Sequence, residues 1–216
     1  MTHPIHRCPR STRTTWRTAS LASLVTLLVA GSLGGCAAVM IGGAAVSGGL
    51  MLTDRRTSGT QIEDEAIELK SGGRIREAIG DRGHVNVTSY NRLVLITGEV
   101  PAEADRDAVE KSVAKIENVI SVTNELAVAG NSSIGSRSND ALLTSKVKAT
   151  FVDAKDLQVN SLKVVTERGI VYLMGRVTER EAGRAAELVR SISGVQKVVR
   201  VFEILSEADL AKLQSR

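Results

Sequence analysis

The sequence predicts an α+β protein with two tandem domains, each ordered α-β-β-α-β, with two helices packed on a three-stranded mixed sheet. One observation is an internal repeat of about 76 residues, in which NRLVLITGEV (91–100) aligns with RGIVYLMGRV (168–177) and VAKIENVISV (113–122) with VRSISGVQKV (189–198). The other is that each copy holds its own helical and β-rich runs. Units of this size are too large for solenoid repeats and indicate two small domains.

The second copy shows its first elements clearly. Ser138, Asn139 and Asp140 are N-cap residue types before ALLTSKVKATF (141–151), whose apolar residues fall on one helical face. Two β-rich runs follow, and Glu167-Arg168-Gly169 between them indicates a hairpin. We therefore expect a helix followed by a β-hairpin.

A second helix and a last strand complete this copy. Thr178-Glu179-Arg180-Glu181 is a capping-box sequence, in which the Thr and Glu181 side chains satisfy free backbone amides. Gly194 is expected to end that helix in a left-handed conformation, a role that Asn118 takes in the first copy. The run 195–205 then predicts the final strand.

The first copy follows the same order with a weaker opening helix. Gly72 and Gly73 interrupt the helical run 63–80, and together they cost about 2 kcal/mol of helix propensity relative to alanine. We therefore expect this helix to be shorter, kinked or frayed. Two acidic clusters lie at predicted helix starts, where the helix macrodipole explains them: Glu63-Asp64-Glu65, and Glu103 with Asp105 and Asp107.

The N-terminus has the zones of a bacterial secretory signal. Residues 1–18 carry four arginines and no acidic residue, and 19–33 form an uncharged apolar run too short for an ordinary membrane span. Leu33-Gly34-Gly35-Cys36 then resembles the bacterial lipobox, which implies cleavage before Cys36 and acylation of its thiol and amine, with palmitate as the typical chain. Ala37 implies sorting to the outer membrane. The alternative is an ordinary signal peptide whose cysteine is buried.

These patterns divide the chain into six segments. They are the lipoprotein signal peptide 1–35, a lipidated N-terminus and flexible tether 36–60, the first domain 61–129, a Gly/Ser-rich linker 130–137, the second domain 138–205 and a C-terminal tail 206–216.

Removing residues 1–35 changes the charge balance. The chain has 28 basic and 24 acidic residues, and four of the basic ones leave with the signal, so the mature chain is formally neutral. The mature chain also keeps few aromatic residues, which together with its neutrality argues against nucleic-acid binding. Cys36 is its one cysteine, which excludes an internal disulfide and a cysteine-based metal site.

No residue pattern points to catalysis, a cofactor or a small-molecule substrate. His84, the one mature histidine, lies on a predicted strand without a paired ligand, so we expect a structural or surface role and no metal site. The sequence contains no G-x-S-x-G elbow. Gly98 and Gly175 stand alone at strand ends and form no phosphate cradle, so a bulge or a close backbone approach is expected there.

Several stretches together carry a resemblance to a known family: SGTQIEDE (58–65), NVTSY (86–90), SNDALLTSKVKA (138–149), VTERGIVYLMGRVTEREA (165–182) and SGVQKVV (193–199). With the lipobox they cover nearly the whole mature chain, and they resemble the dual BON-domain outer-membrane lipoproteins of the DolP/YraP type. The resemblance implies a non-enzymatic lipoprotein in the periplasmic leaflet of the outer membrane that maintains envelope integrity. It also implies that the first helix of the second domain contacts anionic phospholipid.

The charges of the sequence agree with that implication. Residues 63–129 hold 13 acidic and 8 basic residues, whereas 137–205 hold 8 acidic and 12 basic. Near an anionic surface each cation contributes about 1 kcal/mol, and inserted apolar side chains add to this. The candidate phospholipid-binding residues are Asn139, Asp140, Leu142, Leu143, Lys146, Val147 and Lys148.

Two alternatives remain at this point. The apolar residues of the candidate helix can instead pack on the sheet while its lysines are solvated. The protein can also be an interaction scaffold that docks an envelope protein partner through its first, acidic domain or through a sheet edge.

Overall fold

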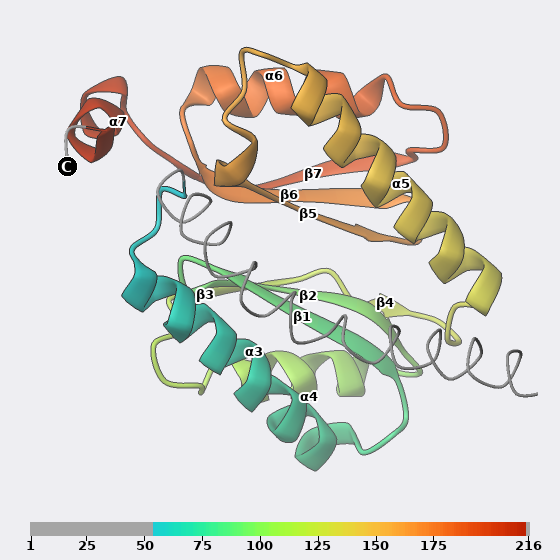
Figure 1. Ribbon diagram of the computed structural model, residues 1–216. Helices are drawn as coiled ribbons and strands as arrows, with labels where there is room; N and C mark the ends of the chain where they lie inside the picture. Colours follow the sequence, from blue (N-terminus) through green and yellow to red (C-terminus); the bar gives the residue numbers. More distant parts are fainter. Residues whose placement is uncertain (1–53, 215–216) are drawn as a thin grey trace, which may run out of the picture. The chain divides into compact units, whose positions relative to one another are not determined.

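The structure, a computed structural model, describes residues 54–214 (Figure 1). The predicted signal peptide, Cys36 and most of the predicted tether lie outside the described residues. Within them the order α-β-β-α-β occurs twice, which confirms the predicted α+β fold, but the sheet of the first domain has a fourth, short strand (Ala127–Val128) where three strands were predicted. All described residues belong to one compact unit.

The first domain packs two helices on one face of a mixed sheet (Figure 1). Strand β2 is central, pairing antiparallel with β1 and parallel with β3 and the short β4. The elements are α3 (Ser58–Ile79), β1 (His84–Tyr90), β2 (Leu93–Val100), α4 (Glu103–Val113), β3 (Ser121–Asn124) and β4 (Ala127–Val128).

Helix α3 is continuous through its two glycines, so the expectation of a shortened or frayed helix is wrong. It begins at Ser58, where the Thr57 hydroxyl accepts a hydrogen bond from the Thr60 amide. A Cβ at Gly72 or Gly73 would have no neighbour within 4 Å, so neither glycine contributes to packing. Burial of one stripe against the sheet outweighs the low propensity of the glycines; this stripe comprises Ile67, Ser71, Ile75 and Ile79.

The second domain repeats this arrangement, with α5 and α6 on one face of a three-stranded sheet (Figure 1). Strand β6 is central, antiparallel to β5 and parallel to β7. The elements are α5 (Ile134–Asp153), the 3₁₀ turn η1 (Val159–Ser161), β5 (Leu162–Glu167), β6 (Ile170–Val177), α6 (Glu179–Arg190) and β7 (Lys197–Ile204), followed by α7 (Glu207–Gln214) in the tail.

Helix α5 begins earlier than its sequence pattern suggests. Ser133 is the N-cap, and its hydroxyl accepts a hydrogen bond from the Ser136 amide. The residues expected at the cap, Ser138 to Asp140, lie inside the second turn. By contrast, the capping box of α6 is present as predicted, since Thr178 and Glu181 each accept a hydrogen bond from the other's amide.

Alternating side chains bury both faces of the central strands. Val94 and Ile96 of β2 pack under the helices of their own domain, and Val171 and Leu173 of β6 do the same in the other. The residues between them point to the opposite faces, where Tyr90, Leu95, Tyr172 and Met174 form one buried cluster. The two sheets therefore share an apolar interface away from their helices.

Candidate functional site

The inward face of α5 belongs to the core of the second domain. Leu143 is 2% exposed, and Val147 and Phe151 are equally buried against β5 and β6. Two of the candidate phospholipid-binding residues, Leu143 and Val147, thus hold the helix on its sheet. A Cβ at Gly194 would lie 2.9 Å from Leu143 Cδ2, so the loop after α6 also packs on this side chain. Gly194 has the predicted left-handed conformation, but the expectation that it ends the helix is wrong, because α6 ends at Arg190 with Ser191 as a right-handed C-cap.

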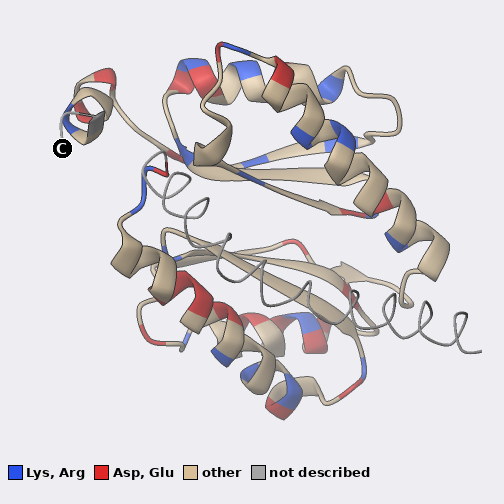
Figure 2. Ribbon diagram, viewed as in Figure 1, with Lys and Arg blue, Asp and Glu red and all other residues tan. Residues whose placement is uncertain are grey.

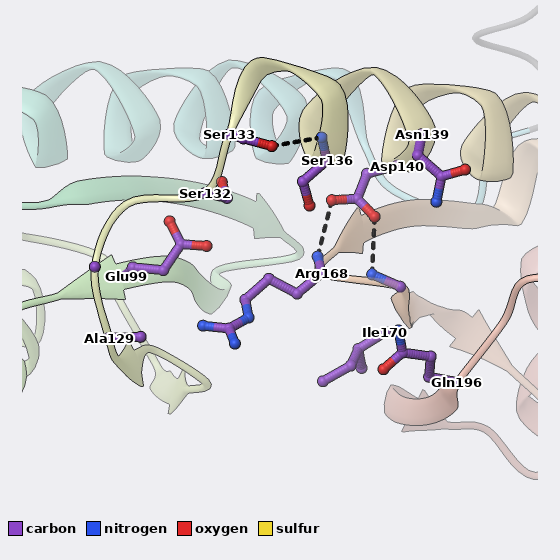
Figure 3. Close-up of a pocket in the computed structure, with 12 residues that line it drawn as sticks. Glu99, Ala129, Ser132, Ser133, Ser136, Asn139, Asp140, Arg168, Ile170 and Gln196 are labelled. Carbon is purple, nitrogen blue, oxygen red and sulfur yellow. Dashed lines mark hydrogen bonds between the residues drawn. The ribbon is translucent and has the colours of Figure 1, made fainter.

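Asp140, a third candidate, is buried and fixes the β5–β6 hairpin. Its two carboxylate oxygens accept hydrogen bonds from the amides of Arg168 and Gly169, at 2.9 and 2.8 Å (Figure 3). Both turn residues have positive φ, as a two-residue type I′ turn requires. The carboxylate therefore stabilises a strained turn from inside the fold.

In the first domain an aspartate also holds the β1–β2 turn, which the sequence pattern did not reveal. Asp64, 76 residues before Asp140, accepts hydrogen bonds from the amides of Asn91 and Arg92, which also have positive φ. Asp64 lies in the second turn of α3 and points inward, so the macrodipole explanation for it is wrong. The repeat offset was the signal that could have revealed this pair.

The outward face of α5 carries exposed apolar and basic side chains together. Ile134, Leu142 and Val152 are 84%, 62% and 69% exposed, although each is a large apolar residue. Lys146 and Lys148 are also exposed. Between Asp140 and Asp153 the helix has no acidic residue, and its middle carries only basic charge (Figure 2).

Helical geometry places Leu142 on the outward side of α5 and the two lysines at its opposite edges. Leu142 and Lys146 are four residues apart and lie about 40° apart around the axis, whereas Lys148 lies about 120° away from Leu142 on the other side. Ala149 and Ser145, both exposed, lie between Leu142 and Lys148. We call the outward surface of Ile134, Leu142, Lys146, Lys148 and Val152 the α5 outer face.

Asn139 lies beside this face and lines a surface hollow (Figure 3). The hollow is bordered by the start of α5, the Arg168-Gly169 turn and the end of β2, and Glu99 contributes to its lining. Its side chains are mostly polar. Of the seven candidates, Leu142, Lys146 and Lys148 are exposed, with the two lysines on either side of Leu142, and Asn139 lies at the edge of this face.

The strand glycines allow a close approach between backbones. Gly98 has φ +116°, and a Cβ there would lie 2.0 Å from the carbonyl oxygen of His84. A Cβ at Gly175 would lie 2.3 Å from the carbonyl oxygen of Ser161, the equivalent position in the second domain. Any larger residue would push the paired strands apart.

No helix between residues 54 and 214 has both the length and the apolar character needed to cross a membrane. Residues 64–130 and 139–206 each match the BON domain family. The chain is 41% identical over 176 residues to the outer membrane lipoprotein DolP of Haemophilus influenzae, with 80% of this chain and 90% of the relative covered.

Two more distant relatives are similar over shorter spans. The 21 kDa hemolysin of Actinobacillus pleuropneumoniae is 29% identical over 151 residues, covering 69% of this chain and 78% of the relative. The osmotically-inducible protein Y of Escherichia coli is 26% identical over 148 residues, covering 65% and 72%.

Proposed function

Because this chain belongs to the BON-domain family, as a tandem BON protein of the DolP type, we propose that it is a non-enzymatic lipoprotein of the outer membrane that maintains envelope integrity. Cys36 carries the acyl anchor, and the α5 outer face binds anionic phospholipid headgroups in the periplasmic leaflet. The observation that carries the proposal is the exposure of Leu142 beside Lys146 on a helix stretch without acidic residues.

The anchor and the helix have different tasks in this proposal. Two or more acyl chains hold a protein stably at a membrane, at about 0.8 kcal/mol per buried methylene, so residence does not depend on α5. The helix adds recognition, because Lys146 and Lys148 contribute about 1 kcal/mol each near anionic lipid. Insertion of the exposed part of Leu142 contributes about 1–2 kcal/mol.

Three of the seven candidate residues are buried and unavailable for lipid contact in this proposal: Asp140, Leu143 and Val147. These three residues shape the helix and its attachment, whereas Leu142, Lys146 and Lys148 make the contact. Ile134 and Val152 extend the apolar contact along the helix.

One observation favours the alternative function of a protein-interaction scaffold. Ile62 and Leu69 of α3 are 67% and 82% exposed and lie seven residues apart, hence on one side of the helix. Glu65 lies between them in sequence and is exposed. An envelope protein with an apolar and basic surface would fit this part of the first domain.

Sedimentation of residues 37–216 with vesicles tests the proposal without the acyl anchor. We expect binding to phosphatidylglycerol-containing vesicles, weakened by salt, and no binding to phosphatidylcholine vesicles. Replacing Lys146 and Lys148 by serine should weaken binding about 30-fold, the equivalent of about 2 kcal/mol.

A matched control replaces Lys111 and Lys115, two exposed lysines of the first domain, by serine. This variant changes the net charge equally and should keep full binding. Equal loss in both variants, or equal binding to neutral vesicles, would refute the assignment of α5 and leave the scaffold function.

A further inference from the structure

Three titratable side chains meet at the interface of the two sheets, outside the α5 outer face. His84 of β1 and Glu99 of β2 are directly opposite each other in the antiparallel pair. Glu167, the last residue of β5, reaches them from the second domain. One ligand atom from each of the three lies within 4.8 Å of the others.

Glu99 is the unusual member of this group. Its side chain is 0% exposed, and neither carboxylate oxygen has a hydrogen-bond partner among the described residues. The imidazole of His84 lies beside it, with Nδ1 3.5 Å from Glu99 Oε2 and also without a hydrogen bond among the described residues. A buried carboxylate is strongly destabilising unless a cation or hydrogen-bond donors compensate its charge.

The equivalent place in the second domain is compensated. Arg176 occupies the position that corresponds to Glu99, and its Nε is 3.1 Å from Glu203 Oε1. Arg176 also donates a hydrogen bond to the carbonyl oxygen of Arg55. Arg176 is thus only partly buried and has an acidic partner, whereas Glu99 is fully buried and the described residues supply no lysine or arginine within ion-pair distance of it.

We propose that His84, Glu99 and Glu167 bind a divalent transition-metal ion, with Zn²⁺ as the representative, at the interface of the two domains. One imidazole nitrogen and two carboxylate oxygens are a ligand set that Zn²⁺ uses, and two carboxylates neutralise its charge. Two ligands of a tetrahedral ion with bonds of about 2.0–2.1 Å lie about 3.3 Å apart, close to the separation of His84 Nδ1 and Glu99 Oε2.

The surroundings of Glu167 support this assignment. Asn86 Nδ2 donates a hydrogen bond to Glu167 Oε2 at 3.1 Å, as outer residues orient carboxylate ligands at metal sites. Burial raises the pKa of Glu167, and the nearby charge of Glu99 adds to the effect, so the two carboxylates repel each other without a cation.

An ion can reach the three side chains from the surface. Glu99 lines the hollow beside the Arg168-Gly169 turn (Figure 3). A second hollow is lined by His84, Asn86 and Glu167 together with residues of α5. The three ligands therefore line two surface hollows, Glu99 one of them and His84 with Glu167 the other.

Binding would join the two domains, because β1 and β2 supply two ligands and β5 the third. An ion bound only by the folded state stabilises it by mass action. At a Zn²⁺ concentration 100 times the Kd, the folding equilibrium shifts about 100-fold, which raises the Tm of a chain of this size by roughly 5–10 °C.

The test is Zn²⁺ titration of the full chain, purified in detergent and stripped with a chelator, by calorimetry and thermal unfolding. We expect one ion per chain and the stated rise in Tm. Co²⁺ in place of Zn²⁺ should give the visible absorption of a tetrahedral N/O site.

Glu99→Gln and Glu167→Gln should each weaken binding at least 100-fold, and Asn86→Ala about 10-fold. Glu99→Gln should also raise the Tm of the metal-free chain, because it removes an uncompensated buried charge. The matched control Glu117→Gln alters a side chain that is 79% exposed and should leave binding unchanged.

Absence of binding at 100 μM Zn²⁺ would overturn the proposal. Binding that survives both Glu99→Gln and Glu167→Gln would also overturn it, by placing the ion elsewhere. If Glu99→Gln fails to fold, Glu167→Gln at the edge of the site decides the question by itself.

Discussion

Replacing Asp140 by alanine should destabilise the protein, because this carboxylate holds the turn between β5 and β6. Two hydrogen bonds to backbone amides, 2.9 and 2.8 Å long, would be lost in a site where Asp140 is 5% exposed. Hydrogen bonds to a charged group contribute about 1.5–3 kcal/mol each, and the relief from burying the charge offsets part of the loss. We expect a net cost of about 3 kcal/mol.

Urea unfolding of residues 37–216, followed by circular dichroism, measures this cost as a change in the free energy of unfolding. In a thermal unfolding experiment the Tm should fall by about 6–12 °C, at 2–4 °C per kcal/mol for a chain of this size. Asp153→Ala, at an exposed position at the end of the same helix, is the control and should change stability by less than about 0.5 kcal/mol. A cost below about 1 kcal/mol for Asp140→Ala would refute the structural role and restore Asp140 as a candidate for lipid contact.

Two further substitutions and one pH dependence follow from the packing. Gly98→Ala should lower the free energy of unfolding by more than about 2 kcal/mol, because its Cβ would lie 2.0 Å from the His84 carbonyl oxygen. Gly72→Ala should stabilise α3 by about 0.5–1 kcal/mol, because a Cβ there meets nothing within 4 Å. Urea unfolding measures both changes. Hydrogen bonds from Arg55 hold the pKa of Glu181 below its usual range. The resulting stability is present above pH of about 4.3 and is lost as the pH falls through the folded-state pKa of Glu181. Arg55→Ala should therefore reduce the difference in unfolding free energy between pH 7 and pH 3. An unchanged difference would contradict the role of Arg55.

Local patterns predicted the parts of the fold whose causes are local. The hairpin at Arg168-Gly169 and the capping box of Thr178 and Glu181 depend on residues adjacent in sequence, and both occur in the structure. Asn118 is left-handed as expected, with φ +68°, but it lies in the loop beyond Ala114, the right-handed C-cap of α4, and does not end the helix. Hydrophobic periodicity and the repeat then determined the order of elements.

The errors arise where distant residues decide the outcome. The continuity of α3 depends on burial of Ile67 and Ile75 against the sheet, which helix propensity does not measure. The role of Asp140 depends on a turn 28 residues away in sequence. His84 lies opposite Glu99 because of the register between β1 and β2. Both lie close to Glu167 because the two domains pack against each other.

The exposed surface of α5 was predicted only in outline for the same reason. Sequence periodicity placed Leu142 and Leu143 on one helix, but the sheet on which α5 packs decides which of the two is buried. The structure exposes Leu142 and buries Leu143, which changes the set of residues available for lipid contact.

A fluorescent probe at position 142 tests the central claim most directly. Residues 37–216 contain no cysteine, so Leu142→Cys gives a single site for an environment-sensitive dye. Leu69→Cys on α3 gives a control at a position that is also exposed, 82% against 62%. If the α5 outer face meets the membrane, phosphatidylglycerol vesicles should shift the emission at position 142 to shorter wavelength and leave position 69 unchanged. A shift at position 69 alone, or none at position 142 while the protein sediments with the vesicles, would contradict membrane contact through α5.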